Sequence, residues 1–308
     1  MSSTTAKHAF TYPAILEVAE RINWRVEDVI GGDQRLDFSK PFLPESLARV
    51  EPLTFLAPAE RQALNHIRAN GYLYMFGVVE EFIVPFVLGH VEKDLRGESY
   101  QVRAFLEFVA EEAKHIHLFR RFQDAFTRGF GTPCPVIGPS RAIGDAVLAH
   151  DPLAVALLIL HIEWMSQHHY VDSVVSDEGL DPLFKSLLKH HWMEEAQHAK
   201  LDTLMVEDLA AHKTPEEIVR GVDEYLEIGA FIDDGLGQQV ELDIAALEHA
   251  TGRTLSAGER AEFAAVQRQA LRFTFIGSGM THEKFLGTLG GLAPAQRQRI
   301  EQIAPTFC

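Results

Sequence analysis

Three side chains of types that commonly bind metal ions stand close together near residue 195. His191, Glu195 and His198 are spaced at i, i+4 and i+7. In an α-helix these offsets place all three side chains on one face, within about two turns. A shorter version of the pattern, Glu112 followed by His115, occurs earlier in the chain. Two Glu-x-x-His steps on separate helices are the ligand pattern of a carboxylate-bridged di-metal site in a four-helix bundle.

Such a site also needs one carboxylate from each of two further helices, inside otherwise apolar stretches. Glu163 follows an apolar run from Leu153 to Leu160 and is the only acid between Asp151 and Asp172. A carboxylate in such a stretch is costly unless it is paired or bound to a cation. The sequence therefore predicts that Glu163 is a metal ligand.

The remaining carboxylate comes from one of two neighbours, Glu80 and Glu81, which both lie in an apolar stretch. The helical stripe through Glu80 continues better, because Leu73, Phe76 and Val84 share its face. Helical periodicity by itself leaves the choice between the two acids open.

The expected metal ligands thus come from four helices, two of which provide a Glu-x-x-His motif. They are Glu80, Glu112, His115, Glu163, His191, Glu195 and His198. Carboxylates combined with two or three imidazoles suit iron or manganese. Carboxylates that bridge would hold two metal ions close together, as O₂ activation at a di-iron centre requires. Because imidazole must be neutral to bind a metal, the metal affinity should fall at acidic pH.

Other polar residues beside these motifs are expected to have lesser roles. Glu111 and Glu194 precede the two motif acids, and we expect them to be exposed, with contacts to the ligands as the alternative. Asp202 lies one turn beyond His198 and is a candidate to orient its ring. His169 is expected on a helix surface or in a subunit contact.

The composition is that of a globular protein with room for a sizeable core. The chain has 308 residues, of which 46% are hydrophobic and 23% charged. A formal net charge of -16 argues against a nucleic-acid partner, since such proteins usually carry a basic face. Two cysteines do not make a disulfide framework. The polar N-terminus lacks a signal core, and the longest apolar run is too short to span a bilayer. We expect a soluble cytoplasmic protein without a membrane partner.

Helical periodicity fills most of the chain, and no alternating run indicates a strand. The predicted bundle helices cover residues 59–95, 99–128, 152–177 and 182–212. A short helix over 14–22, a loop-rich stretch over 31–57 and a Gly/Pro-rich crossover over 129–141 accompany them. Further helices are predicted over 214–231, 236–250, 256–276 and 293–303, with Gly277 and Gly279 as interruptions. Pro85 should kink the first bundle helix or remove one of its hydrogen bonds. The fold prediction is an all-α single domain, 1–308, with a core bundle at 59–212 and the C-terminal helices of 213–308 packed on it.

The combined motif pattern resembles the aminoarene N-oxygenase family of di-iron proteins, whose type member is p-aminobenzoate N-oxygenase. The residues that carry the resemblance are Glu80, Glu112-x-x-His115, Glu163 and His191-x-x-x-Glu195-x-x-His198. The third histidine, His191, separates that family from most ferritin-like enzymes. The resemblance covers about residues 60–210 and rests on the motifs. It favours Glu80 over Glu81, because the family's first ligand is followed by a polar residue and then two apolar ones, as in Glu80-Glu81-Phe82-Ile83.

The resemblance implies a ferritin-like core and an O₂-activating non-haem di-iron oxygenase that acts as a homodimer. An external electron donor such as a reductase would reduce two iron ions. An oxygen atom would then pass to an amine nitrogen or another oxidisable centre of a small-molecule substrate. Position in the motif makes Glu112 and Glu195 bridges or clamps, Glu80 and Glu163 terminal or bridging acids, and the three histidines nitrogen ligands. No catalytic residue beyond the metal ligands is implied.

Other functions fit the same ligand set. One is a di-iron oxidase or desaturase that acts on a lipid or acyl substrate. Another is a ferritin-like iron-binding protein or ferroxidase without an organic substrate, although residues 213–308 weigh against it because they suggest a covered pocket. A metal-free scaffold would need Glu80 and Glu163 to pair with Arg or Lys, and few basic residues are spaced to reach them.

Overall fold

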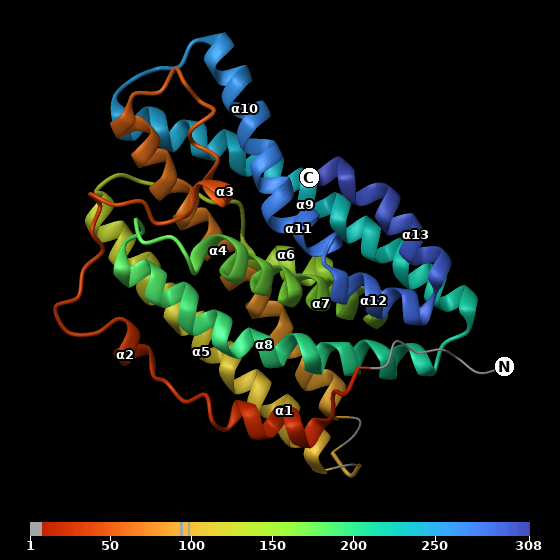
Figure 1. Ribbon diagram of the computed structural model, residues 1–308. Coiled ribbons are helices and arrows are strands. Elements are labelled where there is room, and N and C mark those ends of the chain that lie inside the picture. The colour runs from red at the N-terminus through yellow and green to blue at the C-terminus, as the bar shows by residue number, and fades with distance from the viewer. Residues whose placement is uncertain (1–7, 93–94, 98) are drawn as a thin grey trace.

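Four long helices form the central bundle of the protein (Figure 1). They are α4 (Pro58–Glu92), α5 (Ser99–Phe130), α7 (Pro152–His169) and α8 (Pro182–Ala211). The computed structural model describes residues 8–92, 95–97 and 99–308, and the regular elements of these residues are all helices. α4 packs against α5, and α7 packs against α8. The predicted all-α fold and its four bundle helices are confirmed, although residues 93 and 94 of the first predicted helix lie outside the described part.

The bundle helices begin where short polar side chains can cap them. The Asp151 carboxylate accepts a hydrogen bond from the Leu153 amide at 2.8 Å, which starts α7. Asp181 does the same for the Phe184 amide at 2.7 Å and starts α8. Both caps are followed by a proline, whose fixed φ suits the first helical position. The predicted helix starts at residues 152 and 182 are therefore confirmed.

Two helical segments differ from the sequence prediction between α5 and α8. The helix α6 (Ser140–Leu148) was not predicted and follows the Gly/Pro-rich crossover. The predicted helix over 152–177 ends in a π-helical turn, η1 (Tyr170–Val174). Such turns insert one residue into the helical repeat, so the residues after His169 face differently from those of a continuous α-helix.

The C-terminal part contributes one very long helix, α9 (Pro215–Thr251), which packs against α4 and α7. The predicted break between residues 231 and 236 is wrong. Buried side chains such as Ile228, Leu236 and Val240 continue along one face of α9 through this stretch. Packing of that face holds the helix together where the local sequence contains two glycines.

The last helices also run through glycines that were predicted to interrupt them. α10 (Ala257–Arg272), the π-turn η2 (Phe273–Gly277) and α11 (Ser278–Met280) follow one another directly. A Cβ atom at Gly277 would lie 2.6 Å from the Phe307 carbonyl oxygen, and one at Gly279 would lie 2.1 Å from the His161 ring. These glycines therefore allow close packing within a helical run. Two of the elements that follow were not predicted, α12 (Glu283–Leu292) and η3 (Ala304–Phe307), whereas α13 (Pro294–Ile303) was.

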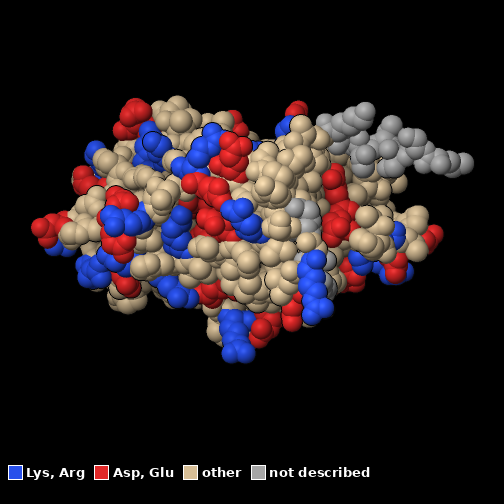
Figure 2. All heavy atoms as spheres, turned by 90° about the horizontal axis from the view of Figure 1, so that it is seen from below, with Lys and Arg blue, Asp and Glu red and all other residues tan. Residues whose placement is uncertain are grey.

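The N-terminal segment lies along the outside of the bundle. It contains α1 (Tyr12–Ala19), α2 (Val26–Val29) and α3 (Glu45–Ala48). α1 packs on α5 and α8, which supports the helix predicted near residues 14–22. On the face seen in Figure 2, acidic and basic side chains are interspersed and form no large patch of one charge.

The helix α4 contains a long apolar stretch. By length and composition alone it could cross a membrane, and 56% of its most apolar window is buried inside the fold. Buried polar side chains, among them Asn65, Arg68 and Glu80, interrupt its apolar surface. This is the pattern of a core helix that also provides polar groups to the interior.

Candidate metal centre

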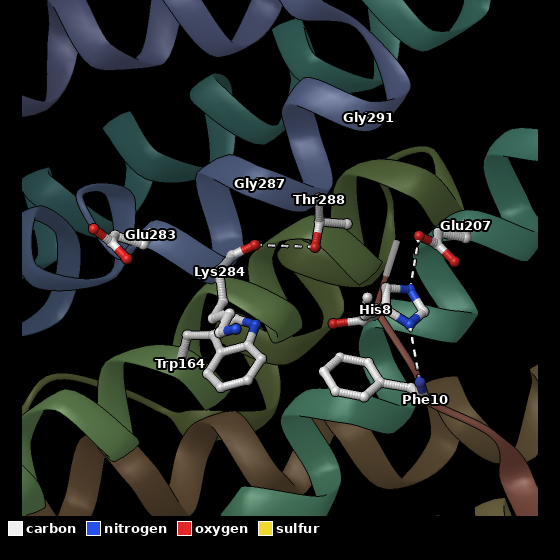
Figure 3. Close-up of a pocket in the computed structure, with 10 residues that line it drawn as sticks. His8, Phe10, Trp164, Glu207, Glu283, Lys284, Gly287, Thr288 and Gly291 are labelled. Atoms are coloured by element: carbon white, nitrogen blue, oxygen red, sulfur yellow. Dashed lines mark hydrogen bonds and ion pairs between the residues drawn. The ribbon is translucent and has the colours of Figure 1, made fainter. Parts of the chain in front are cut away.

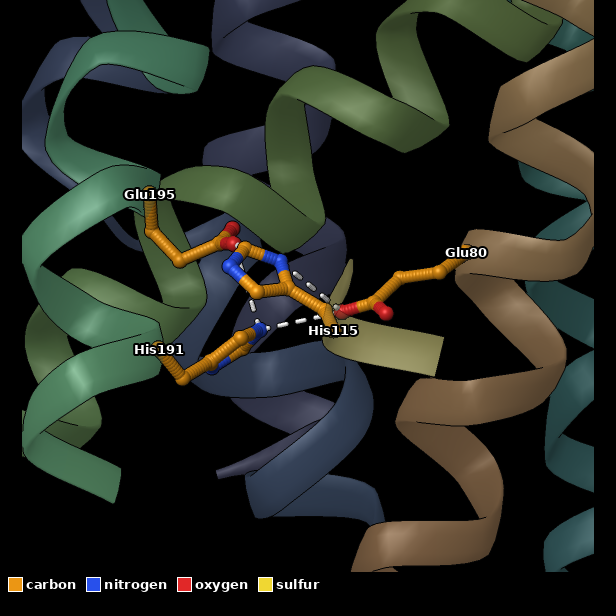
Figure 4. Close-up of side chains that lie close together, drawn as sticks. All are labelled: Glu80, His115, His191 and Glu195. Atoms are coloured by element: carbon orange, nitrogen blue, oxygen red, sulfur yellow. Dashed lines mark hydrogen bonds and ion pairs between the residues drawn. The ribbon is translucent and has the colours of Figure 1, made fainter. Parts of the chain in front are cut away.

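Four of the predicted ligands converge at the centre of the bundle (Figure 4). α4 and α5 provide Glu80 and His115, and α8 provides His191 and Glu195. Their candidate ligand atoms all lie within 4.8 Å of one another. The His191 Nε2 atom is 3.0 Å from Glu80 Oε1 and 3.2 Å from Glu195 Oε1. Neighbouring ligand atoms around a metal ion with bonds of about 2.1 Å lie about 3 Å apart, so this group suits one metal ion.

A second group shares two of these residues. Glu112 and His198 join His115 and Glu195 in a set whose ligand atoms are again within 4.8 Å of one another. The His198 Nδ1 atom lies 2.8 Å from Glu112 Oε1 and 3.4 Å from Glu195 Oε1. Glu163 reaches the same nitrogen from α7, with its Oε2 atom at 3.9 Å. Because Glu195 belongs to both groups, its carboxylate is placed to bridge two metal ions.

Several buried atoms of the cluster have no hydrogen-bond partner. All seven predicted ligands are at most 5% exposed. The unpaired atoms are Glu80 Oε2, both carboxylate oxygens of Glu112, Glu163 Oε2, Glu195 Oε1, and Nδ1 of His115 and His198. Each buried unpaired polar atom costs about 1–3 kcal/mol, and more if it is charged. Coordination of two cations would satisfy these atoms together, so the residues present fit a di-metal site.

The pKa shifts of the clustered residues also indicate that the carboxylates need positive charge nearby. Burial, followed by the charge of Glu112, raises the pKa of Glu80 well above its usual value. Burial and the charge of Glu195 do the same to the pKa of Glu163. Burial opposes a charge on His191, but Glu195 and Glu80 outweigh it and raise the pKa of this imidazole to about 10. Without metal ions, the carboxylates must therefore be stabilised by protons held within the cluster.

The structure separates the two candidate acids of α4. Glu80 is 3% exposed and lies in the cluster. The neighbouring Glu81 side chain is one-third exposed and pairs with Arg120 Nη2 at 2.7 Å. Since successive residues of a helix point about 100° apart, only one of the two can face the bundle centre. The structure thus brings the predicted ligand Glu80 into the cluster and leaves Glu81 outside it.

Two acids that were expected to be exposed are buried behind the histidines. The Glu194 carboxylate lies 2.8 Å from His115 Nε2, and the Glu111 carboxylate lies 2.9 Å from His198 Nε2. A protonated Nε2 that donates to a carboxylate leaves the lone pair of Nδ1 free for a metal. Lys114 forms an ion pair with Glu194. The exposure expectation was wrong because the opposing helices α5 and α8 bury each other's outer acids.

Asp202 does not orient His198, contrary to the sequence hypothesis. Its side chain is fully buried, and neither carboxylate oxygen has a hydrogen-bond partner. Glu111 on the opposing helix holds the outer nitrogen of His198 instead. Burial raises the pKa of Asp202 well above its usual value, so its neutral form is favoured.

Histidines that were expected to be at the surface are part of the core. His169 is 2% exposed, and its ring nitrogens lie 3.0 Å from the Tyr72 hydroxyl and 3.1 Å from Ser278 Oγ. These contacts connect α4, α7 and α11 beside the bundle. His161 is buried as well and contacts the Tyr225 hydroxyl at 2.6 Å. Neither contact is visible in the sequence, because the partner residues are far away along the chain.

A polar pocket of about 280 Å³ lies beside Trp164, the residue after Glu163 (Figure 3). The N-terminal segment forms one wall, where His8 Nε2 is 3.0 Å from a Glu207 oxygen. α12 forms another wall with Lys284 and Thr288. The indole N–H of Trp164 has no hydrogen-bond partner and its ring stacks on the His282 ring. This pocket is not visible in the sequence, because residues from four distant segments form it.

Comparisons with known proteins give similarity in structure but none in sequence. No protein-family model matches the chain, and no curated protein sequence matches it. Two mutants of an R2-like ligand-binding oxidase with a Mn/Fe cofactor illustrate the structural similarity. One, aerobically reconstituted, is 15% identical with a TM-score of 0.46, over 87% of this chain and 91% of that chain. The other, anaerobically reconstituted, is 16% identical with a TM-score of 0.45, over 85% of this chain and 93% of that chain. At such values the similarity assigns no function to this chain, and the resemblance to aminoarene N-oxygenases stays a prediction.

Proposed function

We propose that this protein is a non-haem di-metal oxidoreductase that uses O₂ to oxygenate a small organic substrate. The observation that carries this proposal is the buried set of unpaired carboxylate and imidazole atoms in two overlapping groups. An amine is the substrate class implied by the resemblance of the ligand motifs. The proposal also requires an external electron donor, which stays a prediction, as do a homodimer and a cytoplasmic location.

The donor set suits iron or manganese, because carboxylates and neutral imidazoles are ligands of intermediate and hard metal ions. A pair of such ions, when bound, supplies the electrons and open positions with which O₂ is reduced. Glu195 would bridge the pair, with Glu80, His115 and His191 on one side. Glu112, Glu163 and His198 would hold the other side.

The protein's own groups prepare this site before any metal binds. Glu194 and Glu111 hold the Nε2–H of His115 and His198, so both rings present Nδ1 to the cluster. Aromatic rings exclude water around the ligands, since Phe76 lies edge-on to His191 at 5.3 Å and Phe108 lies 4.2 Å from His198. A dry site favours oxygenation of the substrate over side reactions with water.

A second candidate is an oxidase or desaturase that acts on an acyl chain. It would use the same ligands, and the apolar cavity described below would admit a hydrocarbon. A ferroxidase would need a polar route for iron ions to the cluster, whereas the small cavity between α4 and α7 has apolar walls.

Metal analysis tests the proposal directly. Protein prepared with Fe(II), or with Mn(II) and Fe(II), should hold two metal ions per chain, and its reduced form should develop a visible absorption band with O₂. Incubation with a panel of aryl amines should then give oxygenated products. Less than one metal ion per chain would contradict the di-metal site, whereas a growing iron mineral without organic product would favour iron storage.

A further inference from the structure

We infer that an apolar channel between α4, α6, α7 and α9 admits a neutral, mainly hydrocarbon substrate to the cluster, and that Met75 and Ile232 form its narrowest point. This inference rests on the proposed function and specifies the class of molecule on which the site acts. It concerns a part of the chain outside all of the ligand motifs.

The outer part of the channel is a cavity of about 410 Å³ at the surface. α6 and the crossover before it form one wall with Ile137, Ala142 and Ile143, and α9 forms the other with Phe231 and Ile232. The volume lies in the range of small-molecule binding sites. Phe231 is 43% exposed, which is unusual for a large apolar side chain, and it lies at this opening. A cavity of this lining stabilises an apolar molecule through burial of its surface.

The inner part is a small cavity of about 20 Å³ between α4 and α7. It shares Met75 and Ile232 with the outer cavity, so these two side chains belong to the walls of both. This volume is about that of one water molecule. A larger molecule must therefore displace the side chains at the narrowest point. Met75 suits such a movement, because methionine is unbranched and has several rotatable bonds.

The inner cavity lies between the helices that carry Glu80 and Glu163. Its walls include the residues immediately before Glu80 and Glu163, and also Phe76. The Phe76 ring is perpendicular to the His191 ring, with 5.3 Å between their centroids. A substrate end that replaces the Phe76 ring in this cavity would therefore contact the ligands themselves.

The charge of the channel selects against carboxylates. Asp234 is the one charged residue in the lining of the outer cavity, and it is exposed at the opening. No lysine or arginine among the described residues belongs to this lining. Arg141 on α6 is 91% exposed and pairs with Asp145, outside the cavity. A fatty acid would bring its carboxylate to a like charge without a cationic partner, whereas a neutral aryl or alkyl amine would meet no such cost.

The polar pocket beside Trp164 fits this role less well. It contains charged residues of both signs, and it shares no lining residue with the inner cavity. A hydrocarbon would have to desolvate those charges on binding.

Binding of two matched probes to the metal-loaded protein tests the channel. The probes are 4-butylaniline, which is neutral at neutral pH, and decanoate, which has the same number of carbon atoms. Calorimetry should show that the wild type binds decanoate about tenfold more weakly than 4-butylaniline. The substitution Ile232→Trp should weaken 4-butylaniline binding about tenfold or more by filling the narrowest point. The matched control Val219→Trp lies on an exposed part of α9 and should leave binding within about twofold.

Metal content and circular dichroism, measured on the same samples, separate the channel from the proposed function. If Ile232→Trp keeps its helix content and two metal ions but binds 4-butylaniline like the wild type, the channel is wrong and the di-metal site stands. If the wild type fails to hold two metal ions, the proposed function fails first.

A second variant guards against misfolding of Ile232→Trp. Asp234→Lys changes only an exposed side chain at the opening, and it should raise the affinity for decanoate about tenfold while the affinity for 4-butylaniline changes little. An unchanged decanoate affinity, or a wild type that prefers decanoate, would overturn the inferred selectivity.

Discussion

The side of the cluster formed by α5 and α8 differs from the side formed by α4 and α7 in what lies behind the ligands. Behind His115 and His198 are the buried acids Glu194 and Glu111, and Lys114 pairs with one of them. Beside Val79 and Ile162, the residues that precede Glu80 and Glu163, lies a cavity with apolar walls. The first side uses charge and hydrogen bonds to fix imidazole rings. The second side provides space without polar groups, as an organic substrate needs.

This division predicts different effects of substitutions on the two sides. Changes behind the imidazoles should alter metal affinity, whereas changes behind the carboxylates should alter stability and substrate binding. Substitution of Glu195, which lies on α8 and belongs to both ligand groups, should have the largest effect.

Glu195→Ala removes the carboxylate that belongs to both groups. We expect the metal content to fall from two ions per chain to less than one. Both metal positions lose a ligand, and the site loses one of the negative charges that attract the cations. Elemental analysis after reconstitution measures this. Glu81→Ala is the matched control, since Glu81 lies at the surface and should leave the metal content unchanged. Equal metal contents in the two variants would contradict the bridging position.

Phe76→Ala tests the apolar side. The ring is 2% exposed, and its removal leaves a cavity, so the free energy of unfolding should fall by about 3–5 kcal/mol. Denaturant unfolding of the metal-free protein measures the change. The variant should still bind two metal ions, because Phe76 provides no ligand atom. Loss of metal together with stability would show that the two sides are not independent.

Glu194→Gln tests the polar side with little change in volume. The His115 Nε2–H would lose its charged acceptor, which should weaken metal binding by about 10–100-fold. Competition with a chelator measures the affinity. Glu207→Gln, a part-buried change elsewhere on α8, is the control and should bind metal as the wild type does. If Glu194→Gln binds metal as tightly as the wild type does, the hydrogen bond from His115 to Glu194 does not contribute to metal affinity.

Asp202→Asn should have the smallest effect, and one that depends on pH. Burial raises the pKa of Asp202 above 3.8 in the folded protein. Its contribution to stability is therefore fully present below the unfolded-state pKa and is lost as the pH rises through the folded-state pKa. The asparagine variant avoids this loss, so its melting temperature relative to the wild type should rise from acidic to neutral pH in metal-free protein. If the difference in melting temperature between the variant and the wild type does not change with pH, Asp202 has the same protonation state in the folded and the unfolded protein.

Sequence periodicity was sufficient for the bundle helices and for most of the side chains that meet at the bundle centre, but it left the choice between Glu80 and Glu81 open. Helical spacing is a local property, so His191, Glu195 and His198 share a face wherever the helix lies. The caps at Asp151 and Asp181 and the isolated acid Glu163 in an apolar run are also visible without the fold. Costs of burial and capping act on single residues and their neighbours, and they therefore appear in the sequence.

The structure decided what depends on contacts between distant segments. Glu111 and Glu194 looked like surface residues, and they are buried because α5 and α8 cover each other's outer acids. Gly277 and Gly279 looked like breaks, and they are sites of close packing against the C-terminal turn and His161. The channel joins Met75 to Ile232 across more than half of the chain. Spacing along one helix thus determined which side chains lie together on one face, whereas the packing of helices decided which imidazole nitrogens face the cluster and which residues line the cavities, because burial is a property of neighbours in space.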